Sequence, residues 1–493
     1  MTTILNEVRM SAYLDSVALM AIAQRLQALA GVEVAGLMIG TPANLQILRE
    51  AGVLSSEGAA AGPGDIVIAL RATSEAAAQA ALAHARQLLD RPRAAAASSA
   101  SWQPRTLHAA LAQSPMANLA LISVPGDFAV AEARKALHAG LHTMIFSDNV
   151  SIADEVSLKR EARDLGLLVM GPDCGTAIIG GAPLAFANIV PRGDIGIIGA
   201  SGTGIQEISC LIARAGRGVS HAIGTGGRDL KAEVGGITTL MAIDLFDADP
   251  ATTHIVIVSK PPADEVAALI LERVGRSPKP FTICFLGDGE RAIPKNAHAV
   301  PVLEAAARSA CGGGKPWVVT SQVPARRGAV RGLFAGGTLA AEAQIVLRGH
   351  NFAVASNAPV PGATRVGKVL DGHVMIDLGA DEYTRGRPHP MIEPAVRDEA
   401  LAAALADRRV AVVLLDCVLG FGGHMDPAGH LAAAVTAGRG KDGPLVIASV
   451  TGTDADPQNR QLQVAKLEAA GIVVAPSNAA AAELAASKVR SAG

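Results

Sequence analysis

The chain has 493 residues, and because single hydrophobic cores stop growing at about 250–300 residues, roughly three or four domains are expected. Its formal net charge of −2 argues against a strongly basic surface and so against nucleic acid as the main partner. Half of the residues are hydrophobic but only 3% are aromatic, so Ala, Val, Ile and Leu must build the core. This composition favours stacked strand–helix units over an all-β sandwich or barrel.

The N-terminal stretch MTTILNEVRMSAYLDS carries charges where a signal peptide has an apolar segment. No run of about 18 uncharged apolar residues suggests a membrane span. The five cysteines have no close pairs, which is typical of reduced thiols. We therefore expect a cytoplasmic protein with neither a membrane nor a nucleic-acid partner.

The first 92 residues read as a small α/β domain. Apolar residues recur at helical spacing over 14–30, and VEVAGLMIG follows as a strand. Thr41 is then the expected N-cap of a helix with Pro42 at its first position. The stretch RPRAAAASSASWQP is rich in alanine and serine and bounded by prolines, so it is the first candidate linker.

One unit then recurs along the chain: an apolar strand, a turn, a helix and another apolar strand. It occupies residues 117–148, 253–288 and 410–452. Strands without alternation are buried on both faces, which predicts parallel sheets covered by helices. The expected fold class is α/β with several Rossmann- or flavodoxin-like parallel-sheet domains. Ligands in such sheets bind beyond the carboxyl ends of the strands, where the turns lie.

A second linker is predicted at 311–332, where glycines and prolines are frequent and apolar periodicity is lost. The predicted domains after the first linker therefore cover residues 106–190, 191–311 and 330–493.

The strongest motif is Asp194-Ile-Gly-Ile-Ile-Gly-Ala-Ser-Gly-Thr-Gly-Ile-Gln-Glu207, read as a strand, a glycine-rich turn and the start of a helix. Ser201 and Thr203 place hydroxyls beside the unpaired N–H groups of that helix, and Gly202 leaves the backbone accessible. This combination suits a phosphate. The alternative is a plain strand-to-helix turn.

Two further loops are candidates for the same role. Gly226, Gly227 and Arg228 follow the next apolar run, and Gly422 and Gly423 follow a strand of the last repeated unit. Thr451 and Thr453, which follow the neighbouring strand of that unit, are predicted to contact substrate. His424 is a weaker candidate because a lone loop histidine is usually solvated.

Asp173 and Cys174 lie on a turn after the strand LLVM. No base for a cysteine nucleophile is evident, so a turn residue beside a ligand is the favoured interpretation. Lys260 directly follows the strand IVIV and precedes two prolines, which would hold a cation at the sheet edge; a solvated loop lysine is the alternative.

Arg385, Arg387 and His389 lie within five residues on a loop stiffened by glycine and proline. Guanidinium groups match carboxylate or phosphate oxygens, so an anion-binding loop is expected, with an exposed basic loop as the alternative. One histidine without cysteines makes a poor metal site, and no metal is expected. His221 and His298 are interpreted as structural.

The motifs GDIGIIGASGTGIQE, IGTGGRDL and GPDCGT resemble the α-subunit of succinyl-CoA synthetase. Residues 118–180 resemble its CoA-binding domain and 193–310 its ligase domain, whereas GGTLAAEA (336–343) and MIDLGADEYTRGRPHPMI (375–392) resemble the β-subunit. The chain as a whole is most similar to the FdrA family of acyl-CoA-synthetase-like proteins. The resemblance implies a Rossmann-type CoA-binding-like domain at 106–190, an α-type ligase-like domain at 191–311 and a β-type CoA-ligase-like domain at 330–493.

The sequence departs from the synthetases at two points. Their phosphohistidine motif Gly-His-Ala-Gly is missing after the strand FTICFLGD, and Ser259-Lys-Pro-Pro262 stands where they carry a glutamate. No room is left for an ATP-grasp nucleotide domain. The resemblance therefore favours a substrate that arrives already activated.

FdrA-family proteins are implicated in allantoin catabolism as a subunit of oxamate carbamoyltransferase, which implies carbamoyl transfer between carbamoyl phosphate and oxamate or oxalurate, in complex with partner subunits. Phosphate is then assigned to Ser201, Gly202, Thr203 and the loops at Gly226–Arg228 and Gly422–Gly423, and charge stabilisation to Lys260 and Arg387. Asp173, Cys174, Arg385, His389, Thr451 and Thr453 are assigned to substrate. The alternatives are an acyl-CoA ligase or transferase that binds CoA, and a scaffold subunit. An oligomer is expected, and CoA is a possible cofactor.

Overall fold

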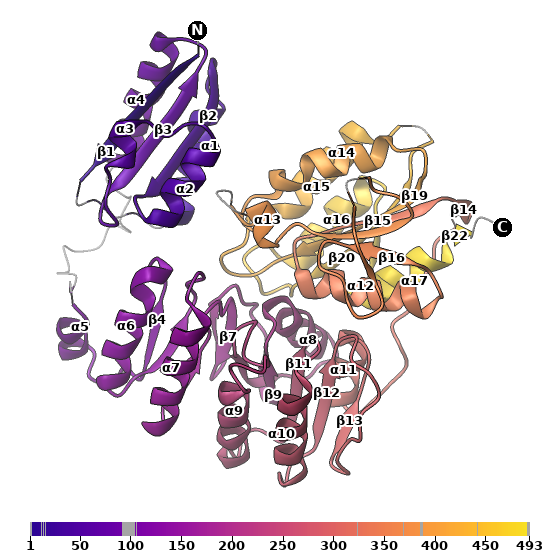
Figure 1. Ribbon diagram of the computed structural model, residues 1–493. Helices are drawn as coiled ribbons and strands as arrows, with labels where there is room; N and C mark the ends of the chain where they lie inside the picture. Colours follow the sequence, from indigo (N-terminus) through magenta and orange to yellow (C-terminus); the bar gives the residue numbers. More distant parts are fainter. Residues whose placement is uncertain are drawn as a thin grey trace. The chain divides into compact units, whose positions relative to one another are not determined.

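The computed structural model describes residues 2–10, 12, 14, 16–90, 104, 106–322, 324–367, 369–384, 388–440 and 442–490. It contains two compact units (Figure 1). The first comprises Met1–Pro104 with Asp381–Pro388, and the second Arg105–Ala380 with His389–Gly493. None of the described helices is long and apolar enough to cross a membrane.

The first unit is a three-stranded antiparallel sheet of order β1-β3-β2 with helices on both faces. Its elements are β1 (Thr3–Arg9), α1 (Ser16–Gln27), β2 (Val32–Ile39), α2 (Pro42–Glu50), α3 (Ser56–Ala59), β3 (Ile66–Ala72) and α4 (Glu75–Asp90). Alternate residues of β3 serve two cores, one under α1 and α4 and one under α2. Thr41 caps α2 through Asn44 N at 3.3 Å, as predicted.

The second unit begins with a three-stranded parallel sheet of order β4-β5-β6. Its elements are α5 (Leu107–Gln113), β4 (Leu119–Ile122), α6 (Gly126–His138), β5 (His142–Ile145), α7 (Ile152–Asp164) and β6 (Val169–Met170).

A seven-stranded sheet of order β13-β12-β11-β9-β10-β7-β8 follows, in which β9 to β13 run parallel to one another. Strand β7 is antiparallel to both of its neighbours, β10 and β8. Its strands are β7 (Thr176–Ile179), β8 (Ala182–Ala185), β9 (Arg192–Gly199), β10 (Val219–Gly224), β11 (His254–Ser259), β12 (Phe281–Phe285) and β13 (Ala297–Ala299). Its helices are α8 (Gly202–Arg214), α9 (Ile237–Ala248), α10 (Asp264–Gly275) and α11 (Leu303–Ala310).

A second seven-stranded sheet, entirely parallel, has the order β17-β16-β18-β15-β19-β20-β21. Its strands are β15 (Ala329–Phe334), β16 (Val354–Ser356), β17 (Thr364–Arg365), β18 (His373–Asp377), β19 (Val410–Val418), β20 (Leu445–Thr451) and β21 (Val473–Ala475). Its helices are α12 (Gly337–Gly349), the 3-10 helix η1 (Pro394–Arg397), α14 (Asp398–Ala406), α15 (Pro427–Gly438), α16 (Arg460–Ala469) and α17 (Asn478–Ser487). The short helix α13 (Asp381–Thr384) belongs to the first unit. The short β14 (Arg326–Arg327) pairs with β22 (Val489–Arg490). The predicted α/β class with parallel-sheet domains is confirmed.

Helices α8, α11, α12 and α17 share one hydrophobic core with both seven-stranded sheets. Most of the core-facing side chains of α17 are alanines, which lets neighbouring helices approach closely. This shared layer places the beginning of α8 beside the beginning of α12, although the two lie in different parts of the sequence.

Glu207, Glu304 and Glu342 are buried in this helix layer. Glu207 of α8 accepts hydrogen bonds from the Thr451 hydroxyl and from Asn478 N. Glu342 of α12 accepts from Leu303 N at 2.6 Å and from the Asn478 amide at 2.7 Å. Burial, followed by the charge of Glu207, raises the pKa of Glu342 to about 8.

We expect this raised pKa to make the protein less stable as the pH rises. The protonated Glu342 contributes stability that is complete below the pKa of an unfolded glutamate and is lost as the pH passes through about 8. Glu342→Gln cannot ionise, so its unfolding free energy should fall less steeply between pH 6 and 9, by at most ~1.4 kcal/mol per pH unit. Denaturant unfolding at several pH values measures this difference. Glu468→Gln, at an exposed position, is the control, and parallel pH profiles for wild type and Glu342→Gln would contradict the prediction.

Candidate active site

The turn between β9 and α8 is built as the sequence predicts. Ser201 is the N-cap of α8, and its hydroxyl accepts from Gly204 N at 3.0 Å. A Cβ at Gly199 would lie 2.5 Å from Ile205 Cγ1, so only glycine fits there. Among the described residues, none accepts from the N–H groups of Gly202 and Thr203, which leaves these donors for a ligand.

The beginning of α12 lies against the same turn. The Thr338 and Ser201 hydroxyls share a short hydrogen bond. A Cβ at Gly336 would lie 3.0 Å from Thr203 Cγ2, so the backbones approach closely. Gly336 provides no side-chain cap for α12. Two helix N-termini, each with a partial positive charge, therefore meet at one place, an arrangement suited to an anion.

A buried ion pair holds the turn before α12. Asp416 on β19 accepts from Ala335 N at 2.8 Å and from Gly336 N at 2.7 Å. The Arg397 guanidinium donates to the same carboxylate at 2.8 Å, and both side chains are almost completely buried. Because these bonds fix the strand-to-helix turn, they also fix the direction in which α12 presents its first N–H groups.

Asp377 and His389 lie close to this turn, from the side of β18. A Cβ at Gly337 would collide with the Asp377 carboxylate, and a Cβ at Gly379 would lie 2.5 Å from His389 Nε2. Desolvation, then Arg397, lowers the pKa of His389 to about 4, so the ring is neutral at pH 7. Its Nδ1 accepts from Met391 N at 3.2 Å, which leaves Nε2 as the protonated nitrogen and a possible donor.

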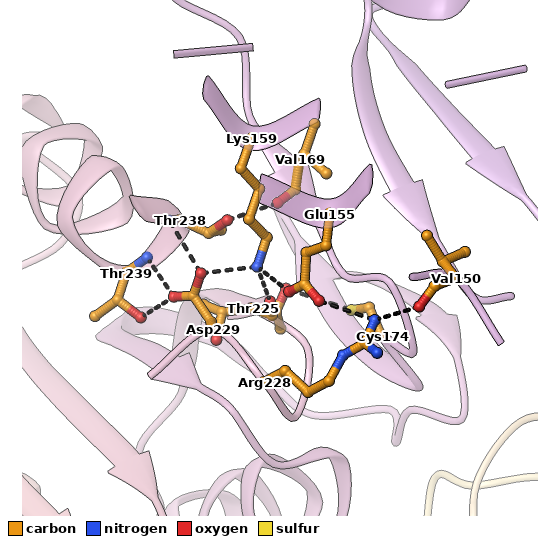
Figure 2. Close-up of polar contacts among 11 residues, drawn as sticks. Val150, Glu155, Lys159, Val169, Cys174, Thr225, Arg228, Asp229, Thr238 and Thr239 are labelled. Atoms are coloured by element: carbon orange, nitrogen blue, oxygen red, sulfur yellow. Dashed lines mark hydrogen bonds and ion pairs between the residues drawn. The ribbon is translucent and has the colours of Figure 1, made fainter. Parts of the chain in front are cut away.

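The loop at Gly226–Arg228 does not join this site. Asp229 accepts from Thr238 N and Thr239 N and so occupies the N-terminus of α9 (Figure 2). Arg228 donates to Val150 O at 2.8 Å and lies 2.9 Å from Glu155 Oε2. The predicted phosphate role of Gly226, Gly227 and Arg228 is therefore corrected: the helix end they would offer is filled by the chain's own carboxylate.

Lys159 completes this buried cluster. Its ammonium donates to Glu155 at 2.9 Å, to Thr225 O at 2.9 Å and to Asp229 at 2.7 Å, and its side chain is 0% exposed (Figure 2). Two cations and two carboxylates balance one another, which compensates part of their desolvation. The cluster ties α7 to the loop before α9.

Gly422 and Gly423 are not at a helix N-terminus either. The following helix, α15, begins at Pro427 and is capped by Asp426, which accepts from Gly429 N at 3.1 Å. A Cβ at Gly422 would lie 2.8 Å from the Phe186 ring. The helix N-terminus that lies beside that of α8 is therefore the one at Gly336–Thr338, and not one at Gly422–Gly423 as the sequence predicts.

Thr451 and Thr453 are buried and paired inside the protein. The Thr451 hydroxyl donates to Glu207, and the Thr453 hydroxyl donates to Ile189 O at 2.7 Å. Their predicted contact with substrate is replaced by contacts that join the two seven-stranded sheets.

The two neighbouring turn residues Asp173 and Cys174 differ in exposure to solvent. Cys174 is buried, its thiol lies 3.3 Å from Gly224 O, and desolvation raises its pKa to about 12. That excludes an activated thiolate, and the core position also corrects the predicted ligand contact of Cys174. Asp173 is exposed on the turn, in the left-handed region with φ of 56°.

The remaining predicted residues fall into three groups. Lys260 is exposed at the carboxyl end of β11, and Arg385 and Arg387 lie outside the described residues.

His298 pairs in register with Thr282, near the start of β12, and so lies at the opposite edge of the sheet from Ser201. His221 contacts Phe246 and accepts from Gly180 N. In the described part of the chain, no group of three potential ligands could hold a metal ion.

Comparison with known families identifies three segments. A family model described as CoA-ligase matches residues 333–488, one described as CoA binding domain matches 192–287, and one described as AllF, heavy metal-associated domain matches 1–104. The CoA-binding match falls where the sequence predicts the α-type ligase-like domain, and the assignment of 106–190 as CoA-binding-like stays a prediction. None of the five cysteines lies in residues 1–104.

Escherichia coli K12 has a relative, "Uncharacterized protein YahF", that is 40% identical over 497 residues, covering 96% of each chain. The chain belongs to the YahF family. Succinate–CoA ligase subunit alpha 1 of Archaeoglobus fulgidus is 25% identical to this YahF-family chain over 196 residues, which cover 38% of it and 64% of the ligase subunit. Acetyl-coenzyme A synthetase 1 of Ca. Korarchaeum cryptofilum aligns at 16% identity over 75% of this chain and 82% of that one, with a TM-score of 0.29. Membership in the FdrA family stays a prediction.

Sequence reasoning missed Gly336, Thr338, Arg397 and Asp416. The segment Ala335-Gly-Gly-Thr338 does follow an apolar strand, and its glycine is followed by threonine as at Gly202-Thr203. Gly336 and Thr338 could therefore have been predicted from this pattern. The Arg397–Asp416 ion pair could not, because the two residues lie on different elements and neither belongs to a local motif.

The buried cluster around Lys159 gives a test of this part of the structure. Lys159→Met removes the central cation and leaves two buried carboxylates with one compensating guanidinium, so we expect a loss of ~3–5 kcal/mol in unfolding free energy. Lys135→Met, which breaks an exposed ion pair with Glu132, should cost at most ~1 kcal/mol. Denaturant titration of both variants makes the comparison, and equal losses would contradict the assigned burial.

Proposed function

We propose that this protein holds the phosphoryl group of an acyl phosphate between the beginnings of α8 and α12 and transfers the acyl group to a thiol such as that of CoA. The observation that carries the proposal is the meeting of two helix N-termini at Ser201 and Thr338, of which that of α12 has no side-chain cap. The matches to CoA-ligase and CoA-binding families support the acyl-CoA side of the reaction.

The chemistry needs no covalent enzyme intermediate. The thiolate attacks the carbonyl carbon, a C–S bond forms, and the C–O bond to phosphate breaks with its electron pair on the leaving phosphate. The thiol proton passes to solvent. The N–H groups of Gly202 and Thr203, with those at the start of α12, stabilise the charge on the departing phosphate. The reverse reaction, phosphorolysis of an acyl thioester, uses the same contacts.

No histidine is phosphorylated in the proposed reaction. His298, the histidine that follows β12, lies at the wrong edge of the sheet for the helix ends. His389 is near the start of α12, and its lowered pKa suits a neutral hydrogen-bond donor. Incubation with a ³²P-labelled acyl phosphate followed by alkaline gel analysis separates the two mechanisms: a stable label on His389 would contradict direct transfer.

A second candidate uses the same helix ends with carbamoyl phosphate as the acyl phosphate and an amide such as oxamate as the acceptor. It is favoured by the match of residues 1–104 to the AllF domain, together with the resemblance of the chain to FdrA proteins. In either case the relatives that are ligase subunits suggest that a partner subunit takes part.

Substitution of the two hydroxyls tests the proposed phosphate site. Ser201→Ala and Thr338→Val should each lower kcat/KM for an acyl phosphate by roughly 100- to 1,000-fold, since the loss of one hydrogen bond to a developing oxyanion costs about that much. The assay follows phosphate release from acetyl phosphate with CoA and from carbamoyl phosphate with oxamate, with and without candidate partner subunits. Comparison of the two rates of phosphate release also shows whether CoA or oxamate is the acceptor.

Thr436→Val is the matched control, because it removes an exposed hydroxyl on α15 and should leave the rate unchanged. Full activity of both Ser201→Ala and Thr338→Val would place the phosphate elsewhere.

A further inference from the structure

Two buried glutamates occupy equivalent positions behind the two helix ends. On α8, Glu207 follows Thr203 by four residues. On α12, Glu342 follows Thr338 by the same interval. Four residues span about 6 Å along a helix, and side chains lean toward its N-terminus, so each carboxyl lies within about one turn of its helix end. Both side chains are buried, and neither takes part in the proposed phosphate contacts.

A single residue, Asn478 at the start of α17, joins the two carboxyls. Its backbone N–H donates to Glu207 at 3.1 Å, and its side-chain amide donates to Glu342 at 2.7 Å. The same amide donates to Leu339 O of α12 at 2.9 Å. Because both carboxyls bond to one residue, a charge on one acts on the other at short range.

Each carboxyl also caps a helix that comes from the other sheet. Glu342 accepts from Leu303 N, the first N–H of α11, at 2.6 Å, where Val302 provides no side-chain cap. Glu207 does the same for α17 through Asn478 N. These bonds fix both carboxyls in place, so a change in the charge of Glu342 is not relieved by rotation of its side chain into solvent.

The surroundings of Glu342 favour its protonated form. Desolvation, followed by the charge of Glu207, raises its pKa to about 8. The other titratable groups that face it are Glu304 of α11 and Cys284 of β12, and burial raises the pKa of that thiol so that it stays neutral. Among the described residues, no Lys or Arg favours the charged form of Glu342. Glu342 therefore changes charge close to neutral pH.

Glu207 has different surroundings. Desolvation raises its pKa too, but Arg214 and Arg460 act in the opposite direction, as do two hydrogen bonds. Burial raises the pKa of the nearby Cys210 thiol well above its usual value, so this group stays neutral. The charge that depends on pH near neutrality is thus the one on Glu342, behind the end of α12.

We propose that ionisation of Glu342 controls anion binding at the ends of α8 and α12, so that the site binds an anion when Glu342 is protonated and releases it when Glu342 is charged. This inference rests on the proposed function, because it takes the anion position as given. A carboxylate within one turn of the helix end offsets the positive end of the helix dipole and repels the anion. By linkage, the bound anion raises the affinity of Glu342 for its proton.

Sulfate is the probe, because it stays a dianion from pH 6 to 9, whereas phosphate itself titrates in this range. In isothermal titration of the full chain, sulfate binding should weaken by roughly 5- to 10-fold between pH 7 and 9, the effect of one charge about 10 Å from a dianion in a largely aqueous site. Glu342→Gln cannot ionise and should bind with nearly constant affinity. Glu468→Gln, at an exposed position on α16, is the matched control and should keep the wild-type profile. A pH dependence that persists in Glu342→Gln would assign the proton to another group and overturn the inference.

Binding heats measured in buffers of different ionisation enthalpy count the protons taken up with sulfate. At pH 8 the wild type should take up a fraction of a proton, at most about one half, and Glu342→Gln none. His389, which lies near the start of α12, has a pKa of about 4 and contributes nothing at this pH. A constant affinity without proton uptake in the wild type would overturn the inference, whatever the variant does.

Asn478→Ala gives a second test that does not need Glu342→Gln to fold. Loss of the amide that donates to Glu342 favours the protonated carboxyl, so the fall in sulfate affinity should move to higher pH than in the wild type. A purely structural role of Asn478 would lower the affinity equally at every pH. An unchanged or lower midpoint would contradict ionisation at Glu342.

Substitution of Ser201 separates this inference from the proposed function. At pH 6, where Glu342 is protonated, Ser201→Ala should weaken sulfate binding. Binding that depends on Ser201 but not on pH would overturn only the coupling to the proton. Binding that does not depend on Ser201 would overturn the proposed function, even if it varied with pH.

Discussion

Two helices that point their positive ends at the same place impose the central constraint on this structure. Neighbouring helix N-termini repel each other, and both α8 and α12 begin with N–H groups that no side chain of the helix caps completely. The shared Ser201–Thr338 hydrogen bond satisfies two hydroxyls but does not supply negative charge. Asp377 lies beside Gly337 and offsets part of the field. A bound phosphate would offset the rest.

The helix layer makes this arrangement possible. Helices α8, α11, α12 and α17 pack between the two seven-stranded sheets, and the alanine-rich α17 lets them come close. Buried polar bonds then fix their positions: Glu207 bonds to Thr451 and Asn478, and Asp416 fixes the turn before α12. These bonds are made between distant parts of the chain, so the geometry of the proposed phosphate site depends on how the parts that carry the two seven-stranded sheets pack together.

The sequence predicted what depends on local patterns. The α/β class, the parallel strands and the Ser201 cap all follow from periodicity and turn chemistry. The partner of Ser201 could not be found in this way, because Thr338 lies 137 positions away and local signals of similar quality occur at Gly226 and Gly422. What separates these three loops is the cap of the helix that follows: the side chains of Asp229 and Asp426 accept from the first N–H groups of α9 and α15, whereas the N-cap residue of α12, Gly336, provides no side-chain cap.

The ion pairs of the buried cluster could not be predicted from local sequence patterns either. The sequence gives no indication that Arg228 is paired with Glu155 of α7, or that Lys159 is buried between two carboxylates. An arginine after a glycine pair is equally compatible with a phosphate and with a buried acid. Only the packing of α7 against the loop decides between them, and that packing is a property of the tertiary structure.

The most direct test of the central claim is a crystal structure of the protein with phosphate or an acyl phosphate analogue. The account predicts an anion between the N–H groups of Gly202 and Thr203 and those at the start of α12, in contact with Ser201 or Thr338. An anion bound instead at Gly226–Gly227 or Gly422–Gly423, with the α8 and α12 ends vacant, would contradict it.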